Sequence, residues 1–252
     1  MKNFILIFSL VLFLSQNSFS KPLKQKDFLI VEILPSTLPL YDIKIEKDYD
    51  QTRYQVRQLH AFFIQKAKKY ARFIILDFFY DDLGIEKIDN QLVEALKSFK
   101  NTAIALGGIY NDQYLLSHNK FLIASGYYGH IFYFKEENGI LLYNQISSCI
   151  FENSPDDCSL FYDHITINVF KALKKPYFFP LMYFIPSETL IRFQRISYED
   201  FMKNPSQAKN KIVILINQVP DESGKTDIHD IPGYGWITGS EILCNIMLQI
   251  SR

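Results

Sequence analysis

The sequence has few cysteines, a single tryptophan and no excess of charge of either sign. Its 252 residues include three Cys and one Trp, and 27 Lys and Arg balance 27 Asp and Glu. A protein that binds the phosphate backbone of a nucleic acid needs a basic surface, and this composition offers none. We therefore expect no nucleic-acid partner.

The short motifs of common catalytic sites are also missing. The sequence contains no G-x-S-x-G nucleophile turn, no H-E-x-x-H zinc motif and no phosphate-binding glycine loop. The group of side chains that most resembles a set of metal ligands is Asp227, His229 and Asp230. One His with two carboxylates is a poor transition-metal site unless residues from other segments complete it. We expect no catalytic residue, no metal and no cofactor, and a metal-dependent hydrolase is the last of our alternatives.

One long hydrophobic run stands out, at the N-terminus. Ser18 and Ser20 follow the run Phe4–Leu14 at the −3 and −1 positions of a cleavage site, which predicts a secretory signal peptide over residues 1–20. The alternative is a retained membrane anchor, but the run is well short of the ~20 residues that span a bilayer. No linker rich in Pro, Gly or Ser divides residues 21–252, so we expect one exported domain, periplasmic or secreted, without a transmembrane segment.

Apolar patterning predicts parallel strands joined by helices. Phe73–Leu76 is a short apolar run, and after it Asp89 is expected to cap a helix whose apolar face recurs through Phe99. The segment NTAIAL then supplies a second strand. A strand, helix, strand series predicts a βαβ unit, whose two strands are parallel.

The C-terminal third repeats this alternation. Lys211–Gln218 is rich in β-branched residues and predicts a strand buried on both faces. A helix is expected to begin at Thr238, and Asn138-Gly139 predicts a hairpin in the middle of the chain. The predicted fold class is α/β, with a mostly parallel central sheet flanked by helices and a β-hairpin insertion.

These pieces resemble the CHASE type 2 domains, which are extracellular sensory domains of bacterial membrane receptors. The matching segments are IILDFF, DNQLVEAL and NTAIAL in the first half, and NKIVILIN, DESGKTDIHDIPG and TGSEILCN near the C-terminus. Two departures are Asn217, where the family usually has glycine, and TDIHD, which lacks the usual Thr-Pro pair. The resemblance implies a sensory module. Its relatives usually precede transmembrane helices and an output domain, whereas this chain ends at Arg252, so we expect a free-standing domain.

Polar residues gather where the predicted strands end. In open parallel sheets, ligands bind beyond the carboxyl ends of the strands. That rule could bring together the acidic residues after Phe73–Leu76, Asn217 in the second predicted strand, and the loop that carries His229. The oxygen atoms of these side chains could bind a divalent cation or a cationic ligand. The alternative is that these side chains only brace loops or face solvent. The candidate ligand-binding residues are Asp77, Asp81, Asp82, Asn217, Asp227, His229 and Asp230.

The cysteines and aromatic residues give two further expectations. An oxidising compartment favours a disulfide between Cys149 and Cys158, and Cys244 is expected to be a buried free thiol. The Pro-punctuated aromatic region 177–184 is expected to be buried; if it is exposed instead, it is a candidate partner interface.

The expected function is that of an exported, non-catalytic, sensor-like domain. Such a domain would bind an unknown small molecule or a membrane receptor partner. The alternative is a secreted structural or interaction protein that reuses the fold, because a fold does not determine a function.

Overall fold

A computed structural model of the chain describes residues 21–45, 49–110, 113–150, 160–220 and 226–251. The predicted signal peptide lies outside these residues. Within them, no helix has the length and apolar character that crossing a membrane requires.

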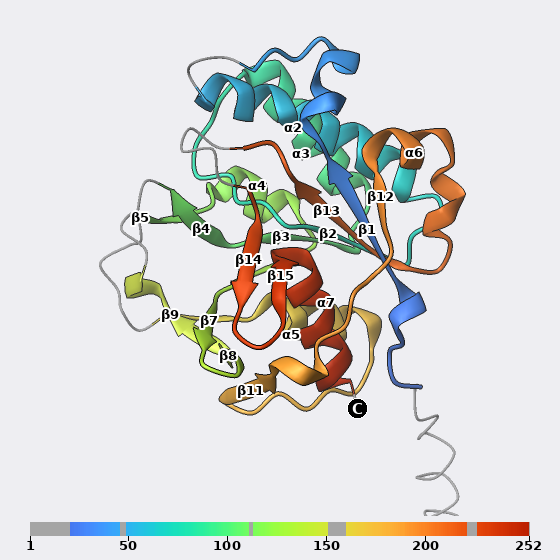
Figure 1. Cartoon of the computed structure of the whole chain (residues 1–252). Coiled ribbons are helices and arrows are strands. Elements are labelled where there is room, and N and C mark those ends of the chain that lie inside the picture. Colours follow the sequence, from blue (N-terminus) through green and yellow to red (C-terminus); the bar gives the residue numbers. More distant parts are fainter. Residues whose placement is uncertain (1–20, 46–48, 111–112, 151–159, 221–225, 252) are drawn as a thin grey trace, which may run out of the picture.

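The centre of the molecule is a six-stranded sheet (Figure 1). All of its neighbouring strands pair in parallel, which confirms the predicted α/β class. Across the sheet, the strands run in the order β12 (Arg195–Ser197), β1 (Phe28–Ile33), β13 (Ile212–Asn217), β2 (Phe73–Leu76), β3 (Thr102–Ala105) and β6 (Tyr127–Gly129).

Helices cover both faces of this sheet, as Figure 1 shows. Side chains of β13 alternate between the two cores, with Val213 and Leu215 in one and Ile214 in the other. This two-sided burial explains why the strand is an uninterrupted apolar run. One face carries α2 (Tyr49–Ala67), α3 (Glu86–Ser98), α4 (Asn119–Ala124) and α6 (Tyr198–Lys203), and the other carries α5 (Ile165–Leu173) and α7 (Gly239–Ile250).

The predicted hairpin is present and is part of a larger insertion. Strands β7 (Tyr133–Glu136) and β8 (Gly139–Tyr143) pair antiparallel around Asn138-Gly139, and β11 (Met182–Pro186) adds a third strand that the sequence did not predict. The remaining strand pairs are β4 (Gly107–Tyr110) with β5 (Gln113–Leu116), β9 (Gln145–Ser147) with β10 (Phe161–Asp163), and β14 (Ile228–Ile231) with β15 (Gly235–Thr238). Five short 3-10 helices complete the described elements: Gln25–Asp27, Pro35–Tyr41, Ser148–Ile150, Ser187–Thr189 and Pro205–Ala208.

Asp89 does not cap α3, contrary to the prediction. The helix begins one turn earlier, at Glu86, and Asp89 is buried within it. Its carboxylate accepts a 2.7 Å bond from the Gly84 backbone N–H and pairs with Arg57 at 2.7 Å. The prediction was wrong because an ion pair from α2, distant in sequence, determines where this acidic residue lies.

The aromatic region around β11 is more exposed than predicted. Phe179 is buried, but Phe178, Met182 and Phe184 are exposed. Strand alternation explains the difference: successive β11 side chains point to opposite faces of a three-stranded sheet, and only one face packs on the core.

Cys244 is a buried free thiol, as predicted. Cys158 lies outside the described residues, so its pairing with Cys149 stays a prediction.

Candidate functional site

A cavity of about 540 Å³ opens at the carboxyl ends of β2 and β13. These two strands are neighbours, yet the chain leaves β2 toward α3 on one face of the sheet and leaves β13 toward α7 on the other. Such a topological switch point leaves a crevice between the two departing loops. Its volume is in the range of small-molecule sites. We call this cavity the strand-end pocket.

The strand-end pocket brings together four of the seven predicted site residues. Asp77 follows β2, Asn217 ends β13, and Asp227 and His229 come from the start of the β14–β15 hairpin. Asp230 is exposed and does not line the pocket, because it follows His229 in a strand and its side chain points to the other side.

The first turn of α7 holds the two pocket carboxylates in place. Asp227 accepts a hydrogen bond from the Gly239 backbone N–H at 3.1 Å and contacts His229 Nε2 at 2.8 Å. The next residue, Ser240, donates its hydroxyl proton to Asp77 at 3.2 Å. Asp227 and Asp77 therefore lie side by side at one end of the pocket.

This proximity changes the acidity of Asp77. Burial and the neighbouring negative charge of Asp227 raise the pKa of Asp77 to about 7, and the hydrogen bond from Ser240 opposes the rise. Near neutral pH, the carboxyl end of β2 thus carries a group that takes up or releases a proton.

Asp81 and Asp82 do not line the pocket; they pair with arginines that do. Asp81 contacts Arg53 at 2.5 Å, and Asp82 contacts Arg57 at 3.1 Å. Arg57 is almost completely buried and also pairs with Asp89. The acidic residues that follow β2 therefore divide into one that faces the pocket, Asp77, and two that neutralise its arginine wall.

Sequence analysis missed the wall that α2 contributes. Arg53, Arg57 and His60 all line the pocket, and their spacing of four and three residues places them on one face of that helix. This spacing was a signal available in the sequence. The opposite wall includes Tyr133 of β7, whose ring contacts His229 edge-to-face at 5.4 Å, and no local pattern marks it.

His60 and Tyr133 on these walls each have a buried atom without a hydrogen-bond partner among the residues that the structure describes. His60 is buried, its Nδ1 contacts the Tyr80 hydroxyl at 2.9 Å, and its Nε2 has no partner in the described part of the chain. The same holds for the buried Tyr133 hydroxyl. Burial, aided by the nearby positive charge of Arg57, lowers the pKa of His60 to about 3, so its imidazole is neutral.

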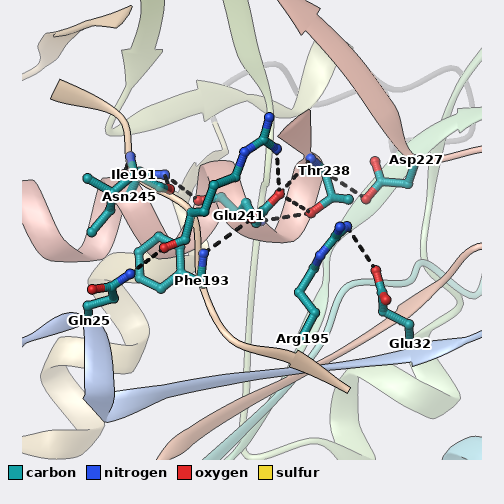
Figure 2. A network of polar contacts seen from close by, with 11 residues as sticks. Gln25, Glu32, Ile191, Phe193, Arg195, Asp227, Thr238, Glu241 and Asn245 are labelled. Carbon is teal, nitrogen blue, oxygen red and sulfur yellow. Dashed lines mark hydrogen bonds and ion pairs between the residues drawn. The ribbon is translucent and has the colours of Figure 1, made fainter. Parts of the chain in front are cut away.

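A buried polar network fixes the start of α7 (Figure 2). Thr238 and Glu241 form a capping box, in which each side chain accepts a hydrogen bond from the backbone N–H of the other residue. Glu241 also accepts a bond from the Phe193 backbone N–H at 3.3 Å, and Asn245 bonds both backbone groups of Ile191 at 2.9 Å. The segment before β12 therefore anchors the helix turn that holds Asp77 and Asp227.

The remaining pocket walls are mainly apolar. Phe78, Phe132, Val219 and Leu243 are among the residues that line them. Across the described ranges, no group of three His, Cys, Asp or Glu side chains lies close enough to hold a metal ion. The arrangement suits a molecule with an apolar body and a polar group that reaches the strand ends.

Comparison of this chain with family models, with curated proteins and with solved structures finds no match.

Proposed function

We propose that this protein is an exported, sensor-like domain that binds a small ligand in the strand-end pocket. The observation that carries the proposal is the pocket itself. Asp77, Asn217, Asp227 and His229 come from three separate segments and meet at one topological switch point. Buried groups that have no partner in the described ranges line the same cavity, and a ligand could satisfy them.

The resemblance to CHASE type 2 domains supports a sensory role. We propose membership of that family on the quoted sequence segments and on the order of strands and helices that they predict. In this role, the occupied pocket would present a changed surface to a membrane receptor partner.

A ligand screen tests the proposed function. Thermal unfolding of residues 21–252, the predicted mature chain, is measured against a panel of small metabolites and divalent metals. A ligand at one hundred times its dissociation constant adds about 2.7 kcal/mol to the free energy of unfolding. We expect at least one compound to raise the melting temperature by several degrees, and Asp77→Ala and His229→Ala to abolish that shift.

Asp230→Ala provides the matched control. Asp230 lies next to His229 but outside the pocket, so this variant should keep the shift. If no compound shifts the transition, or if the shift survives both pocket substitutions, binding in the strand-end pocket is contradicted.

The outer face of the β7–β8–β11 sheet favours a second candidate, an interaction protein. Phe134, Leu141 and Phe184 lie side by side across the three strands, and Phe134 and Phe184 are exposed. Apolar side chains gathered on one surface are typical of a contact with another protein. Under this alternative, a Phe134→Ser/Phe184→Ser variant loses a partner that wild-type protein captures from the producing cell's envelope, while the ligand-induced thermal shift is unchanged.

Export has its own test. We expect N-terminal sequencing of the protein recovered outside the cytoplasm to begin at Lys21, because Ser18 and Ser20 mark the cleavage site. An N-terminus at Met1 in a membrane fraction would favour the retained anchor instead.

A further inference from the structure

The polar end of the strand-end pocket lies at the N-terminus of α7 and carries the carboxylates of Asp77 and Asp227. A helix N-terminus with free backbone N–H groups attracts phosphate or carboxylate ligands. At α7, however, Asp227 already accepts the Gly239 N–H, and the adjacent Ser240 hydroxyl is directed to Asp77. An anionic ligand would meet two side-chain carboxylates at this end of the cavity, so the site disfavours anions.

The arginines on the other wall do not reverse this preference. Arg53 is paired with Asp50, Asp81 and Asp82, and Arg57 is paired with Asp82 and Asp89. Lys135 also lines the cavity, but it is exposed, so solvent screens its charge.

On both walls, buried polar atoms have no hydrogen-bond partner among the described residues, and a ligand could supply one. The Tyr133 hydroxyl belongs to the wall that carries His229, and its oxygen can accept a hydrogen bond from a bound group. Across the cavity, His60 Nε2 has no partner within the described part of the chain, and the residue is only 2 % exposed. A group left unsatisfied in this way is costly unless something else bonds it.

We infer that the ligand of the strand-end pocket is an organic cation, a protonated amine attached to an apolar or aromatic body. The ammonium group would lie between Asp77 and Asp227 and donate to the Tyr133 hydroxyl. The body would pack among Phe78, Phe132 and the apolar side of α7. Aromatic faces also attract such a cation. This inference rests on the proposed function and adds a ligand class to it.

The same contacts favour an amine over a divalent metal. Calcium takes six to eight oxygen ligands, and magnesium demands near-octahedral geometry. Here one carboxylate oxygen of Asp227 is engaged by His229 and the other by Gly239. An ammonium group needs only a few acceptors around it.

Matched ligand sets test the inference on wild-type residues 21–252. Each set places an amine, an alcohol and a carboxylate on one body: tryptamine, tryptophol and indole-3-propionate, then phenethylamine, 2-phenylethanol and 3-phenylpropionate. Hexylamine, magnesium chloride and calcium chloride complete the panel. Isothermal titration at pH 7.5 gives each dissociation constant. We expect at least one amine to bind at least tenfold more tightly than its alcohol and its carboxylate.

Variants locate the binding. Asp77→Asn and Asp227→Asn should each weaken the amine at least tenfold, because each removes one carboxylate from the ammonium group. Tyr133→Phe should weaken it severalfold. Asp230→Asn, the matched control on the same hairpin, should leave the dissociation constant unchanged. Circular dichroism of each variant checks that it is folded, and the comparison among ligands on the wild-type protein does not depend on any variant.

Three results would overturn the inference. In the first, an alcohol, a carboxylate or a metal binds as tightly as the amines, which leaves a ligand-binding pocket but of another class. In the second, Asp77→Asn and Asp227→Asn both retain full amine affinity. In the third, no amine binds: if compounds from the metabolite screen still bind, only the ligand class fails, whereas if those also fail, the proposed function fails with it.

Discussion

The carboxylate of Asp227 lies directly on the backbone of Gly239. The Gly239 N–H bonds Asp227 Oδ2 at 3.1 Å, and a Cβ atom at position 239 would lie 2.6 Å from Asp227 Oδ1. A side chain at position 239 would therefore have to displace the carboxylate of Asp227, a residue distant in the sequence.

Gly239→Ala should displace Asp227 and disrupt the strand-end pocket. Alanine is the better helix former by about 1 kcal/mol, so a helix position without this contact would gain stability. Here we expect the variant to lose stability, because the new methyl group overlaps the carboxylate. Urea unfolding measures the change. The control is the same substitution in an Asp227→Ala background, where the overlapping carboxylate is absent. There, adding Gly239→Ala should cost less stability than it costs in the wild-type protein.

Asp77 should make stability depend on pH around neutrality. Its pKa is raised to about 7 in the folded protein, so between pH 4 and 7 the folded state retains a proton that the unfolded state releases. The stability that this carboxyl contributes at low pH is lost as the pH rises through 7. Asp77→Asn, which stays neutral, should therefore gain about 2 to 3 kcal/mol relative to wild type when the pH is raised from 5 to 8, because each of the roughly two pH units between 5 and the folded-state pKa contributes about 1.4 kcal/mol.

Urea midpoints at the two pH values measure this gain, and Asp230→Asn should show none. A difference between Asp77→Asn and wild type that is equal at pH 5 and pH 8 would contradict the prediction. Asp227, Tyr133 and Cys244 are close enough to Asp77 to interact with its charge. The other titratable and charged groups that line the strand-end pocket are His229 on β14, Lys135 on β7, and Arg53, Arg57 and His60 on α2.

Two buried histidines should oppose this trend in acid. The rings of His130 and His164 are 4.8 Å apart and fully buried. Burial lowers the pKa of His130 to about 4, and burial together with the charge of His130 lowers the pKa of His164 well below its usual value. The unfolded state then binds more protons below about pH 6.5, so stability falls as the pH drops toward 4.

A His130→Phe variant tests this origin of acid sensitivity. Phenylalanine fills a similar space and cannot take up a proton, so the variant should lose less stability than wild type between pH 7.5 and pH 4.5. Equal losses, measured by urea unfolding, would assign the acid sensitivity to other groups.

The Arg57–Asp89 ion pair should be costly to break. Both side chains are 1 % exposed and 2.7 Å apart. Asp89→Ala leaves a buried guanidinium short of a partner and should cost about 3 to 5 kcal/mol in the free energy of unfolding. An Arg57→Met/Asp89→Leu variant should cost less than Asp89→Ala alone. The exposed pair of Lys97 and Glu94 is the control, and its removal should change stability by less than about 1 kcal/mol.

The predicted disulfide can be tested by counting thiols. If Cys149 and Cys158 are paired, the oxidised protein contains one free thiol, that of Cys244, and it reacts only after denaturation because it is buried. Mass spectrometry after alkylation in denaturant should find one labelled cysteine without reductant and three with it. Three labelled cysteines in both samples would show that the pair does not form.

Much of the central sheet was predictable from local pattern. Phe73–Leu76 and the core of Lys211–Gln218 are strands as predicted, and the helix predicted to begin at Thr238 begins at Gly239, with Thr238 as its N-cap. Their apolar runs and capping residues act over a few positions, which a sequence displays directly. The strand-end rule also placed Asp77 and Asn217 at one site, because the carboxyl ends of neighbouring parallel strands share an edge.

Other features depended on contacts between distant segments. Asp81, Asp82 and Asp89 have the same charge as Asp77, yet they pair with arginines of α2, and only the packing of that helix assigns these partners. The exposure of Phe184 follows from the third strand of the insertion, which joins residues about forty positions apart.

The sequence by itself determined several central strands and helices, and that the end of β2 is acidic, because periodicity and composition are local properties. Only the tertiary structure decided that Asp77 and Asp227 both accept hydrogen bonds from the first turn of α7. It also decided that Asp81 and Asp82 are paired with arginines of α2. The physical reason is that a carboxylate's role depends on the charges and hydrogen-bond donors within a few ångströms of it, and here those groups come from elements far away in the chain.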